Sequence, residues 1–342
     1  MNHILRNLSL LPVLAAVLAA SCSKDSGEGT NAAAQRQFDA WRAIHYPAAA
    51  EKDGIYIIED IPGTGLEWRE SLPVTFLNYT VRNLDGTVSS NSDEQWAKQL
   101  GNWNRTYYYG PQTLLTGENL SYAGLDILLE GMKQGGTRTA IIPSWMSTYS
   151  RYDTPAEYLE HESEASSAIY TITFLEQPAT ESLAAYELEN ILRPYSIRNW
   201  QVSDTLGTAA VFFKSFTTFA TEPAEMPSDT TVYINYIGRR VYDDQVFDTN
   251  IADVAKDYYI YDASRTYAPV AVTWAEEATS IKMNSSTVIK GFAYGLHNMH
   301  AGEKASFAFG YNLGYGSSGG SNKYMIPPYA ALRFDVELVP AP

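Results

Sequence analysis

Few side chains in this 342-residue chain have the types and spacing of conventional catalytic or metal-binding groups. His297 and His300 form an H-x-x-H pair that could supply two imidazole ligands to a metal ion. They fall in an expected turn, and no cysteine, aspartate or second histidine pair stands nearby at ligand spacing. Glu160, His161 and Glu162 could bind a cation, but such an acidic cluster is more typical of a solvated surface. We therefore expect no metal ion at either place.

Phosphate binding and cysteine-dependent catalysis find no better support. The glycine-rich segment around Gly316 opens no predicted helix and lacks the lysine of a phosphate-binding loop, so it is interpreted as a mobile loop. No cysteine–histidine pairing is evident, because Cys22 is the only cysteine in the chain. The sequence implies no cofactor.

The C-terminal third has aromatic and apolar residues at regular spacing instead. The segments VYINYIG from Val232 and ALRFDVEL from Ala331 alternate with a period of two, which is typical of half-buried antiparallel strands. Between them, VIKGFAYGLHNMHAGEK from Val288 has apolar residues at the spacing of one helix face. A glycine-rich loop and the Pro327-Pro328 turn precede the last strand. The combination is more specific than any one of these elements alone.

In this order and spacing, together with VFD from Val246, these segments of residues 232–338 resemble the FKBP-type peptidyl-prolyl cis-trans isomerase domain. The resemblance implies an enzyme that rotates X-Pro amides, which face a barrier of about 18–20 kcal/mol and isomerise unaided in tens to hundreds of seconds. No bond is broken in this reaction. A site can therefore accelerate it by excluding water, holding the proline ring in an apolar pocket and binding the twisted amide better than the planar one.

The resemblance also implies which residues form the pocket. Its catalytic walls and polar rim would be Tyr236, Phe247, Asp248, Ile289, Phe292, Tyr315 and Phe334, and further substrate-binding contacts would come from Val288, Met325 and Ile326. The Ile289 backbone N–H and the Tyr315 hydroxyl would donate hydrogen bonds to substrate carbonyl groups. Phe292 stands where many relatives have tryptophan, so the pocket is expected to be deeper.

Three features depart from the family pattern. Thr287 replaces a common glutamate, and Gly310 replaces a common proline. The segment 249–287 is an insertion, because it separates Phe247 from Val288 by more than the family's usual distance. It contains five large aromatic residues, namely Tyr258, Tyr259, Tyr261, Tyr267 and Trp274. The insertion could extend the recognition surface for an unfolded chain, or it could pack over the sheet as a lid.

The chain also contains an internal repeat. Asn78-Tyr79 matches Asn235-Tyr236 inside similar strands. A second set of positions matches at a constant offset of 167 residues, with Gly124, Leu129, Met132 and Gly135 corresponding to Gly291, Leu296, Met299 and Gly302. GIYIIEDIPGTG from Gly54 and AIYTITFLE from Ala168 resemble the first and last strands of the same family. We therefore predict an α+β protein with two FKBP-like domains in tandem, each a curved antiparallel sheet around a short helix.

The expected domain boundaries follow from these matches and from changes in composition. Residues 54–178 would form a degenerate FKBP-like domain, 179–204 a linker helix with apolar residues from Leu183 to Leu192, and 205–340 the isomerase domain, opening on the strand AVFFKSFTTF from Ala210. Residues 22–53 would be a tether followed by a short amphipathic helix that packs on the first domain through Phe38, Trp41 and Ile44.

The first domain keeps the frame of the family but has lost most pocket residues. Tyr79 remains, Val88-Ser89 stands near the expected Phe-Asp, and Ser121-Tyr122 replaces Val-Ile. Leu125 replaces the aromatic floor, and a polar stretch of residues 144–167 replaces the Ile-Pro-Pro turn. We predict that this domain is catalytically silent and serves in docking, dimerisation or client binding.

Composition limits the kind of partner. The net charge of −15 argues against nucleic acid, because proteins that bind phosphate backbones concentrate Lys and Arg. Twenty-five tyrosines and seven tryptophans favour a sheet-rich protein. The expected partners are proline-containing unfolded or exported polypeptides.

Residues 1–21 have the features of an export signal. Arg6 is the only charge ahead of the apolar stretch 8–20, and small residues precede Cys22. This place resembles a bacterial lipobox, with Ala19 where the family pattern prefers Leu, so Cys22 would be the lipidated N-terminus of the mature protein. Two or more acyl chains hold a protein firmly on a membrane. The alternative is a soluble secreted protein with a free cysteine.

The residues after Cys22 suit a lipoprotein tether. Residues 23–35 are rich in Ser, Gly, Ala and charge, which is typical of a flexible linker. Ser23, Lys24 and Asp25 faintly resemble surface-export signals of Bacteroidetes lipoproteins. The expected location is the cell envelope, on the periplasmic face of the outer membrane or on the cell surface.

Two function classes remain open at this point. The first is a lipid-anchored isomerase that assists folding of exported proteins in the bacterial cell envelope. The second is a non-catalytic module that binds client chains or partner proteins through the aromatic insertion and the acidic surface.

Overall fold

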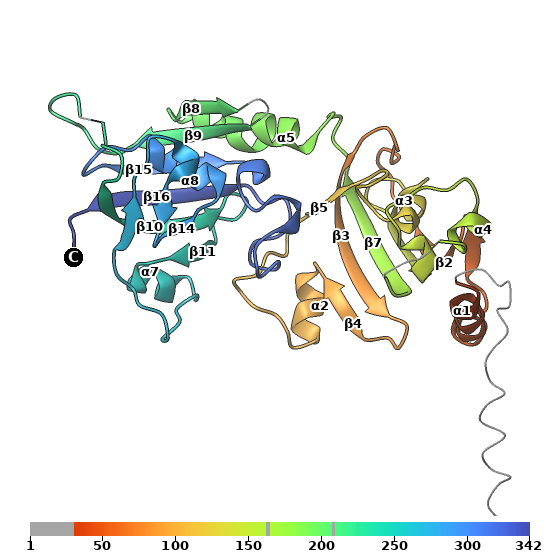
Figure 1. The fold of residues 1–342 in the computed structure, drawn as a ribbon. Helices are drawn as coiled ribbons and strands as arrows, with labels where there is room; N and C mark the ends of the chain where they lie inside the picture. Colours follow the sequence, from red (N-terminus) through yellow and green to blue (C-terminus); the bar gives the residue numbers. More distant parts are fainter. Residues whose placement is uncertain (1–30, 162–164, 207–208, 224) are drawn as a thin grey trace, which may run out of the picture.

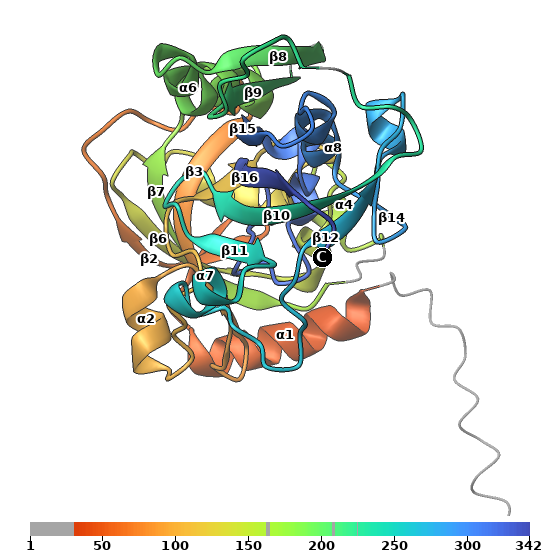
Figure 2. The same cartoon turned by 90° about the vertical axis from the view of Figure 1, so that its left-hand side faces the viewer.

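The structure is a computed structural model that describes residues 31–161, 165–206, 209–223 and 225–342. The predicted signal, Cys22 and most of the predicted tether lie outside the described residues. Two β-rich units follow one another along the chain, and a short helical segment leads from one to the other (Figure 1). Turned by 90°, the second unit lies in front of the first (Figure 2).

The first unit is a seven-stranded antiparallel sheet with strand order β1-β2-β6-β7-β3-β4, and β5 pairs with β3 outside this path. The short helix α3 (Ala123–Leu129) packs on it and buries Leu128 and Leu129 in the core. The strands are β1 (Ala50–Lys52), β2 (Ile55–Ile61), β3 (Val74–Asn83), β4 (Val88–Asn91), β5 (Gln112–Leu115), β6 (Thr137–Ile142) and β7 (Ala168–Glu176).

The helix α1 (Ala32–His45) covers one end of this unit, as predicted. Phe38 is buried and meets Trp145 edge to face, with ring centroids 5.4 Å apart. Ile44, however, is 76% exposed, so its predicted place on the packing face is wrong. The helix ends at His45, and Trp41 and Tyr46 fill the contact beyond Phe38.

The linker is helical from Leu183 to Ile197. It consists of α5 (Leu183–Tyr186), the π-helical segment η2 (Glu187–Leu192) and α6 (Arg193–Ile197). The Ser182 hydroxyl accepts the Ala185 N–H and so satisfies a backbone donor of the first turn.

The second unit is a nine-stranded sheet with strand order β14-β13-β12-β10-β16-β15-β9-β8, and β11 pairs with β10. Its first strand begins at Gln201, within the segment expected as linker. The strands are β8 (Gln201–Leu206), β9 (Ala209–Ser215), β10 (Thr231–Arg240), β11 (Val246–Thr249), β12 (Val270–Thr273), β13 (Lys282–Met283), β14 (Ser286–Thr287), β15 (Lys304–Phe309) and β16 (Leu332–Val339).

The helix α8 (Lys290–His297) lies very close to this sheet. A Cβ atom at Gly291 would lie 2.3 Å from the Phe309 ring, and one at Gly295 would lie 2.2 Å from the Phe307 ring. Only glycine allows this approach, and it explains why both positions lack a side chain.

The two units share their construction in detail. In the first, the Ser92 hydroxyl accepts the Tyr79 N–H at 2.9 Å; in the second, the Asn250 side chain accepts the Tyr236 N–H at 2.8 Å. Each hydrogen bond joins the residue that follows the short paired strand to the middle of the longest strand. The predicted α+β class is confirmed, because two antiparallel sheets follow one another along the chain and each has a short helix packed on it.

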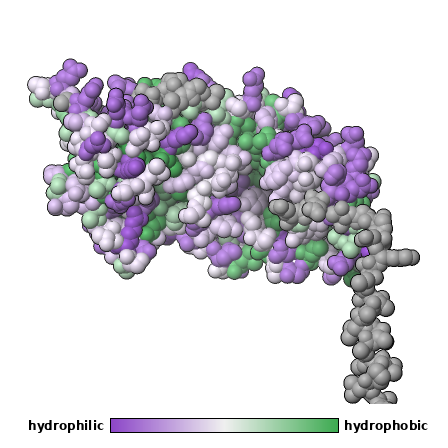
Figure 3. All heavy atoms as spheres, in the orientation of Figure 1, coloured by the Kyte–Doolittle hydropathy of each residue, from purple (hydrophilic) through white to green (hydrophobic). Residues whose placement is uncertain are grey.

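The remaining short elements lie in connections. They are α2 (Glu94–Gln99), η1 (Ser144–Met146), α4 (Pro155–Tyr158), α7 (Ala252–Asp257), η3 (Ala278–Ser280), η4 (Tyr311–Leu313) and η5 (Gly316–Ser318). Among the described residues, no helix has the length and apolar character needed to cross a membrane. Hydrophilic residues cover most of the face seen in Figure 3, with hydrophobic residues in separate patches.

Candidate active site

Four predicted wall residues come together in the second unit from four different elements. They are Tyr236 on β10, Phe247 on β11, Phe292 on α8 and Phe334 on β16. All four are buried, and Phe292 meets Phe334 with ring centroids 4.7 Å apart and Tyr236 with centroids 6.1 Å apart. Phe247 meets Phe334 edge to face at 5.7 Å. The rings therefore form one cluster.

Two further aromatic rings pack against this cluster, and they were not predicted from the sequence. Phe307 and Phe309 on β15 are fully buried and stack on Phe334, with ring centroids 6.1 and 5.9 Å away. The alternation in KASFAF from Lys304 was the signal that could have placed them on the core face.

The polar rim is a three-residue network. The Tyr236 hydroxyl donates to the Asp248 carboxylate at 2.7 Å. Arg265 donates to the same carboxylate and, at 3.0 Å, to the Tyr236 hydroxyl. Arg265 comes from the insertion and was not predicted, because nothing in its local sequence indicates a contact with β10 or β11. A charge-assisted network of this kind holds the Tyr236 ring at a fixed tilt.

The electrostatics of this rim exclude proton transfer near neutral pH by Tyr236. Burial, and secondarily the Asp248 carboxylate, raise the pKa of Tyr236 far above its usual value, although Arg265 opposes this. Burial and Asp248 also raise the pKa of Tyr315. Both hydroxyls therefore stay protonated and can serve as hydrogen-bond donors or dipoles, not as bases.

The other predicted residues border the aromatic cluster. Val288, Ile289 and Met325 are half-buried against it, and Ile326 is a buried member of it. Tyr315 is 38% exposed at its edge. Within the described residues, neither the Ile289 N–H nor the Tyr315 hydroxyl has a hydrogen-bond partner. Both expected donors are therefore free for a substrate, while their roles remain predictions.

The insertion packs on the sheet through some of its aromatic residues and exposes others. Its strand β12 pairs with β10, and Trp274 is buried in the core cluster. Tyr258 accepts a hydrogen bond from Arg239. Tyr259, in contrast, is 64% exposed, and Tyr261 stacks on Tyr267 at 5.1 Å on the outside. One side of the insertion packs on the sheet and the other presents tyrosines to solvent.

The first unit has an apolar depression beside Tyr79, which corresponds to Tyr236. This depression of about 170 Å³ is lined by Leu77, Tyr79, Val81, Gln112, Thr113, Leu114, Leu125, Tyr170 and Ile172. The Tyr79 hydroxyl bonds to Ser90 at 3.1 Å, in the place of the Tyr236–Asp248 contact. The strand pairing therefore sets Ser89-Ser90, and not Val88-Ser89, against Phe247-Asp248. Both strand pairs have a bulge at the equivalent place, because one residue is skipped between β3 and β4 and one between β10 and β11.

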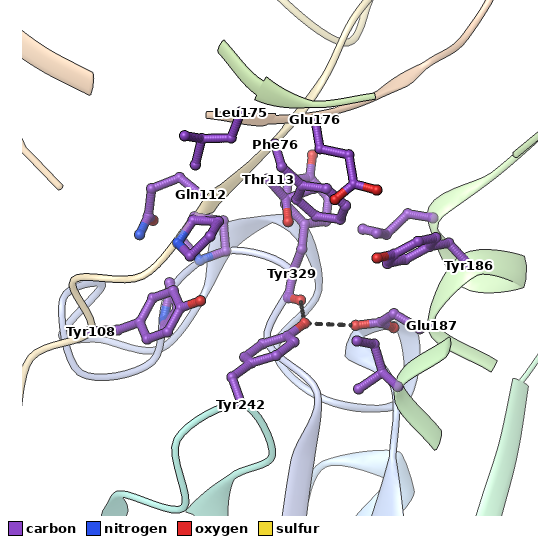
Figure 4. Close-up of a pocket in the computed structure, with 15 residues that line it drawn as sticks. Phe76, Tyr108, Gln112, Thr113, Leu175, Glu176, Tyr186, Glu187, Tyr242 and Tyr329 are labelled. Carbon is purple, nitrogen blue, oxygen red and sulfur yellow. Dashed lines mark hydrogen bonds between the residues drawn. The ribbon is translucent and has the colours of Figure 1, made fainter. Parts of the chain in front are cut away.

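A separate cavity of about 230 Å³ lies between the two units (Figure 4). Strand β3, the end of β7, the linker and the turn Pro327-Pro328 contribute to its walls. The Glu187 side chain in this wall is 2% exposed, and it accepts hydrogen bonds from the Tyr242 hydroxyl at 3.1 Å and the Tyr311 N–H at 3.0 Å. Burial raises the pKa of Glu187 to about 7.

Glu187 also explains a departure from the family pattern. A Cβ atom at Gly310 would lie 2.5 Å from its carboxylate oxygen, so a residue larger than glycine would displace it. Sequence reasoning assigned no role to Glu187, because it lies in a helical pattern between apolar residues.

The two histidines considered as metal ligands have other contacts. The His297 ring bonds to the Glu276 carbonyl at 2.8 Å, and His300 lies beside Glu303 at 3.2 Å. In the part of the chain that the structure describes, no group of three or more His, Cys, Asp or Glu side chains is placed to hold a metal ion.

Comparison with known families bears on the second unit. Residues 222–339 match the family model of the FKBP-type peptidyl-prolyl cis-trans isomerases. This segment is an FKBP-type domain. It contains all the predicted pocket residues, and the family match does not extend to the first unit.

Individual relatives are similar over short stretches. Over 84 residues the chain is 34% identical to the macrophage infectivity potentiator of Trypanosoma cruzi. This match covers 25% of this chain and 37% of that protein. Over 63 residues it is 41% identical to FK506-binding protein 2 of Candida glabrata. This match covers 18% of this chain and 45% of that protein. The chain thus spans less than half of either relative.

A solved structure gives a broader but distant alignment. The three FKBP domains of wheat FKBP73 align over 84% of this chain and 94% of that one, with 17% identity and a TM-score of 0.29.

Proposed function

We propose that this protein is a peptidyl-prolyl cis-trans isomerase that acts through its FKBP-type domain on proline-containing polypeptides. The observation that carries the proposal is the convergence of Tyr236, Phe247, Phe292 and Phe334 beside two unengaged hydrogen-bond donors.

The site acts on conformation and not on bonds. The aromatic rings and Ile289 would hold the proline ring away from water, where the twisted amide, having lost its resonance, is less polar than the planar one. The Ile289 N–H and the Tyr315 hydroxyl would hold the carbonyl groups beside it. The network of Tyr236, Asp248 and Arg265 keeps the rim rigid, so little reorganisation is needed as the bond turns.

A protease-coupled assay with a short proline peptide tests this. The double variant Tyr236→Ala/Phe292→Ala should lose the acceleration, because it removes one wall and the floor. The matched control is Tyr79→Ala/Leu125→Ala, which makes the equivalent changes in the first unit and should leave the rate unchanged. Retained acceleration in the first variant, or equal loss in both, would defeat the assignment of the site.

A non-catalytic client-binding module is the second candidate, and the exposed tyrosines of the insertion favour it. Tyr259 and Tyr261 offer apolar area to an unfolded chain without reaching the aromatic cluster. Suppression of client aggregation without acceleration of the test peptide would select this function. Under either function the first domain would serve in docking, dimerisation or client binding.

We further propose that the protein is exported and held by lipid on Cys22 in a bacterial cell envelope. The basis is the sequence of residues 1–25 alone, with its resemblance to a lipobox and to Bacteroidetes surface-export signals. Expressed in a bacterial host and labelled with a fatty acid, the wild-type chain should carry label and sediment with membranes. Cys22→Ala should do neither, and label on the variant would remove the assignment.

A further inference from the structure

Two predicted substrate-binding residues of the FKBP-type domain lie on a loop with little regular structure. We call residues 319–329 the mouth loop, since it carries Met325 and Ile326. Its internal hydrogen bonds centre on Asn322, whose carbonyl accepts the Met325 and Ile326 N–H groups at 3.1 and 2.9 Å and whose side chain accepts the Tyr324 N–H at 3.1 Å and the Met325 N–H at 3.3 Å. The Gly320 N–H donates to the Ile326 carbonyl at 2.9 Å. Gly319 has a φ of 70°, and a Cβ there would lie 2.7 Å from the Ile326 carbonyl oxygen. These bonds close the loop on itself, and it has further support from outside.

That support comes from the first domain. We call residues 104–110 the tyrosine loop. Tyr107 stacks on Tyr324 of the mouth loop, with ring centroids 5.1 Å apart and planes 17° apart. The Tyr108 N–H donates to the Tyr324 carbonyl at 2.7 Å. One ring contact and one backbone hydrogen bond thus fix the same residue.

A buried arginine ties the two loops together. Arg240, at the end of β10, is 1% exposed and donates from one nitrogen both to the Thr106 carbonyl, at 2.9 Å, and to the Met325 carbonyl. Its other two nitrogens bind the Asp243 carboxylate. A buried charge is costly unless its donors are satisfied, so this guanidinium favours the arrangement in which both loops are in place.

The tyrosine loop is itself rigid enough to act as a support. The Asn104 side chain accepts the Thr106 N–H at 2.9 Å, and the Tyr109 hydroxyl accepts the Asn104 N–H at 3.1 Å. The Tyr108 ring lies 5.8 Å from that of Tyr242, and both face the cavity shown in Figure 4. Such a side-chain-closed turn presents its rings with little loss of entropy on contact.

We infer that the first domain positions the mouth loop, and so shapes substrate binding by the other domain. The inference rests on the isomerase function proposed above. It gives the degenerate domain a task that needs no pocket of its own. Tyr107 and Tyr108 are positioning residues, because they act through Tyr324 and Met325 and touch no predicted wall of the cluster.

The test uses the full chain and three variants. Tyr107→Ala removes the ring stack, Tyr107→Phe keeps it, and Trp103→Ala is the matched control. Trp103 directly precedes the tyrosine loop, and its indole N–H donates to Glu94 of α2 while the Lys98 ammonium group lies over its ring. The readouts are amide hydrogen exchange of residues 320–326, and the KM and kcat for a proline peptide.

In Tyr107→Ala, exchange in the mouth loop should rise by about 2- to 10-fold, the range expected for loss of one aromatic pair. Exchange in β15 and β16 should not change. KM should rise at least twofold and by more than kcat falls, because the loop contributes to binding. Tyr107→Phe and Trp103→Ala should match the wild type. Tyr324→Ala should reproduce the effect, with no further increase in the double variant.

Wild-type exchange and KM in Tyr107→Ala would overturn the inference, and so would the same changes in Trp103→Ala. Failure of the isomerase function is distinguishable, because a wild-type chain without activity would still report through hydrogen exchange. Should Tyr107→Ala fail to fold, Tyr324→Ala, which changes a partly exposed side chain, carries the same test.

Discussion

The stability of this protein should fall with rising pH because of one buried carboxyl group. Glu187 joins the linker to the FKBP-type domain through Tyr242 and Tyr311, and burial raises its pKa from 4.5 to about 7. In the unfolded chain the carboxyl group is already ionised at pH 6, while in the folded protein it is still protonated. The native state thus binds the extra proton, and the free energy of unfolding decreases between pH 4.5 and 7.

The size of the stability loss follows from the pKa shift of Glu187. One pKa unit corresponds to 1.36 kcal/mol, so a shift from 4.5 to about 7 costs about 3 kcal/mol of stability at pH 8 relative to pH 4. Glu187→Gln should remove this loss. Its amide oxygen can accept the Tyr311 N–H, and its NH₂ can donate to the Tyr242 hydroxyl, which then donates to the Tyr329 carbonyl, its other acceptor at 3.1 Å.

Urea unfolding at several pH values measures this directly. The wild type should lose about 3 kcal/mol more than Glu187→Gln between pH 4.5 and 8. The control is Glu189→Gln in the same linker, whose pairing with Arg193 is exposed and should contribute little. Parallel pH profiles of wild type and Glu187→Gln would show that the carboxyl group is not buried as described.

Three further predictions concern the FKBP-type domain. Arg265→Met should lower kcat/KM for a proline peptide by about 3- to 10-fold, because it removes a charge-assisted contact from Asp248 and Tyr236; an unchanged value would mean that the insertion has no role in the rim. Gly295→Ala should destabilise the domain by about 1–3 kcal/mol, since its Cβ would lie 2.2 Å from the Phe307 ring, and thermal unfolding at wild-type temperature would contradict the close packing of α8. Finally, kcat should be flat between pH 6 and 8.5, because the raised pKa of Tyr236 keeps its hydroxyl protonated; a bell-shaped profile would point to acid–base chemistry instead.

The walls of the site were predictable because they follow periodic patterns. Tyr236 and Phe334 lie on strands whose alternation marks one face, and Phe292 lies on the apolar face of a short helix. The internal repeat predicted the same arrangement of strands and short helix in the first domain. Ile44 was misplaced because a helical spacing near the end of a helix does not show whether a partner surface extends that far.

The rest could not be read from the sequence, because it depends on contacts between irregular segments. Arg265 reaches the rim from an insertion with no periodicity, and Glu187 is buried only because the linker folds back on Tyr242 and Tyr311. The stack of Tyr107 on Tyr324 joins two loops far apart in the chain. Local composition contains no information about such pairings.

The most direct test of the account is two-dimensional proton NMR exchange spectroscopy on a short X-Pro peptide, to which a substoichiometric amount of the full chain is added. Unaided isomerisation takes tens to hundreds of seconds, so cross-peaks between the cis and trans forms should be absent without the protein. We predict that they appear with the wild type and vanish in Tyr236→Ala/Phe292→Ala. A folded wild-type chain that produces no cross-peaks, or cross-peaks that survive in the double variant, would contradict the central claim.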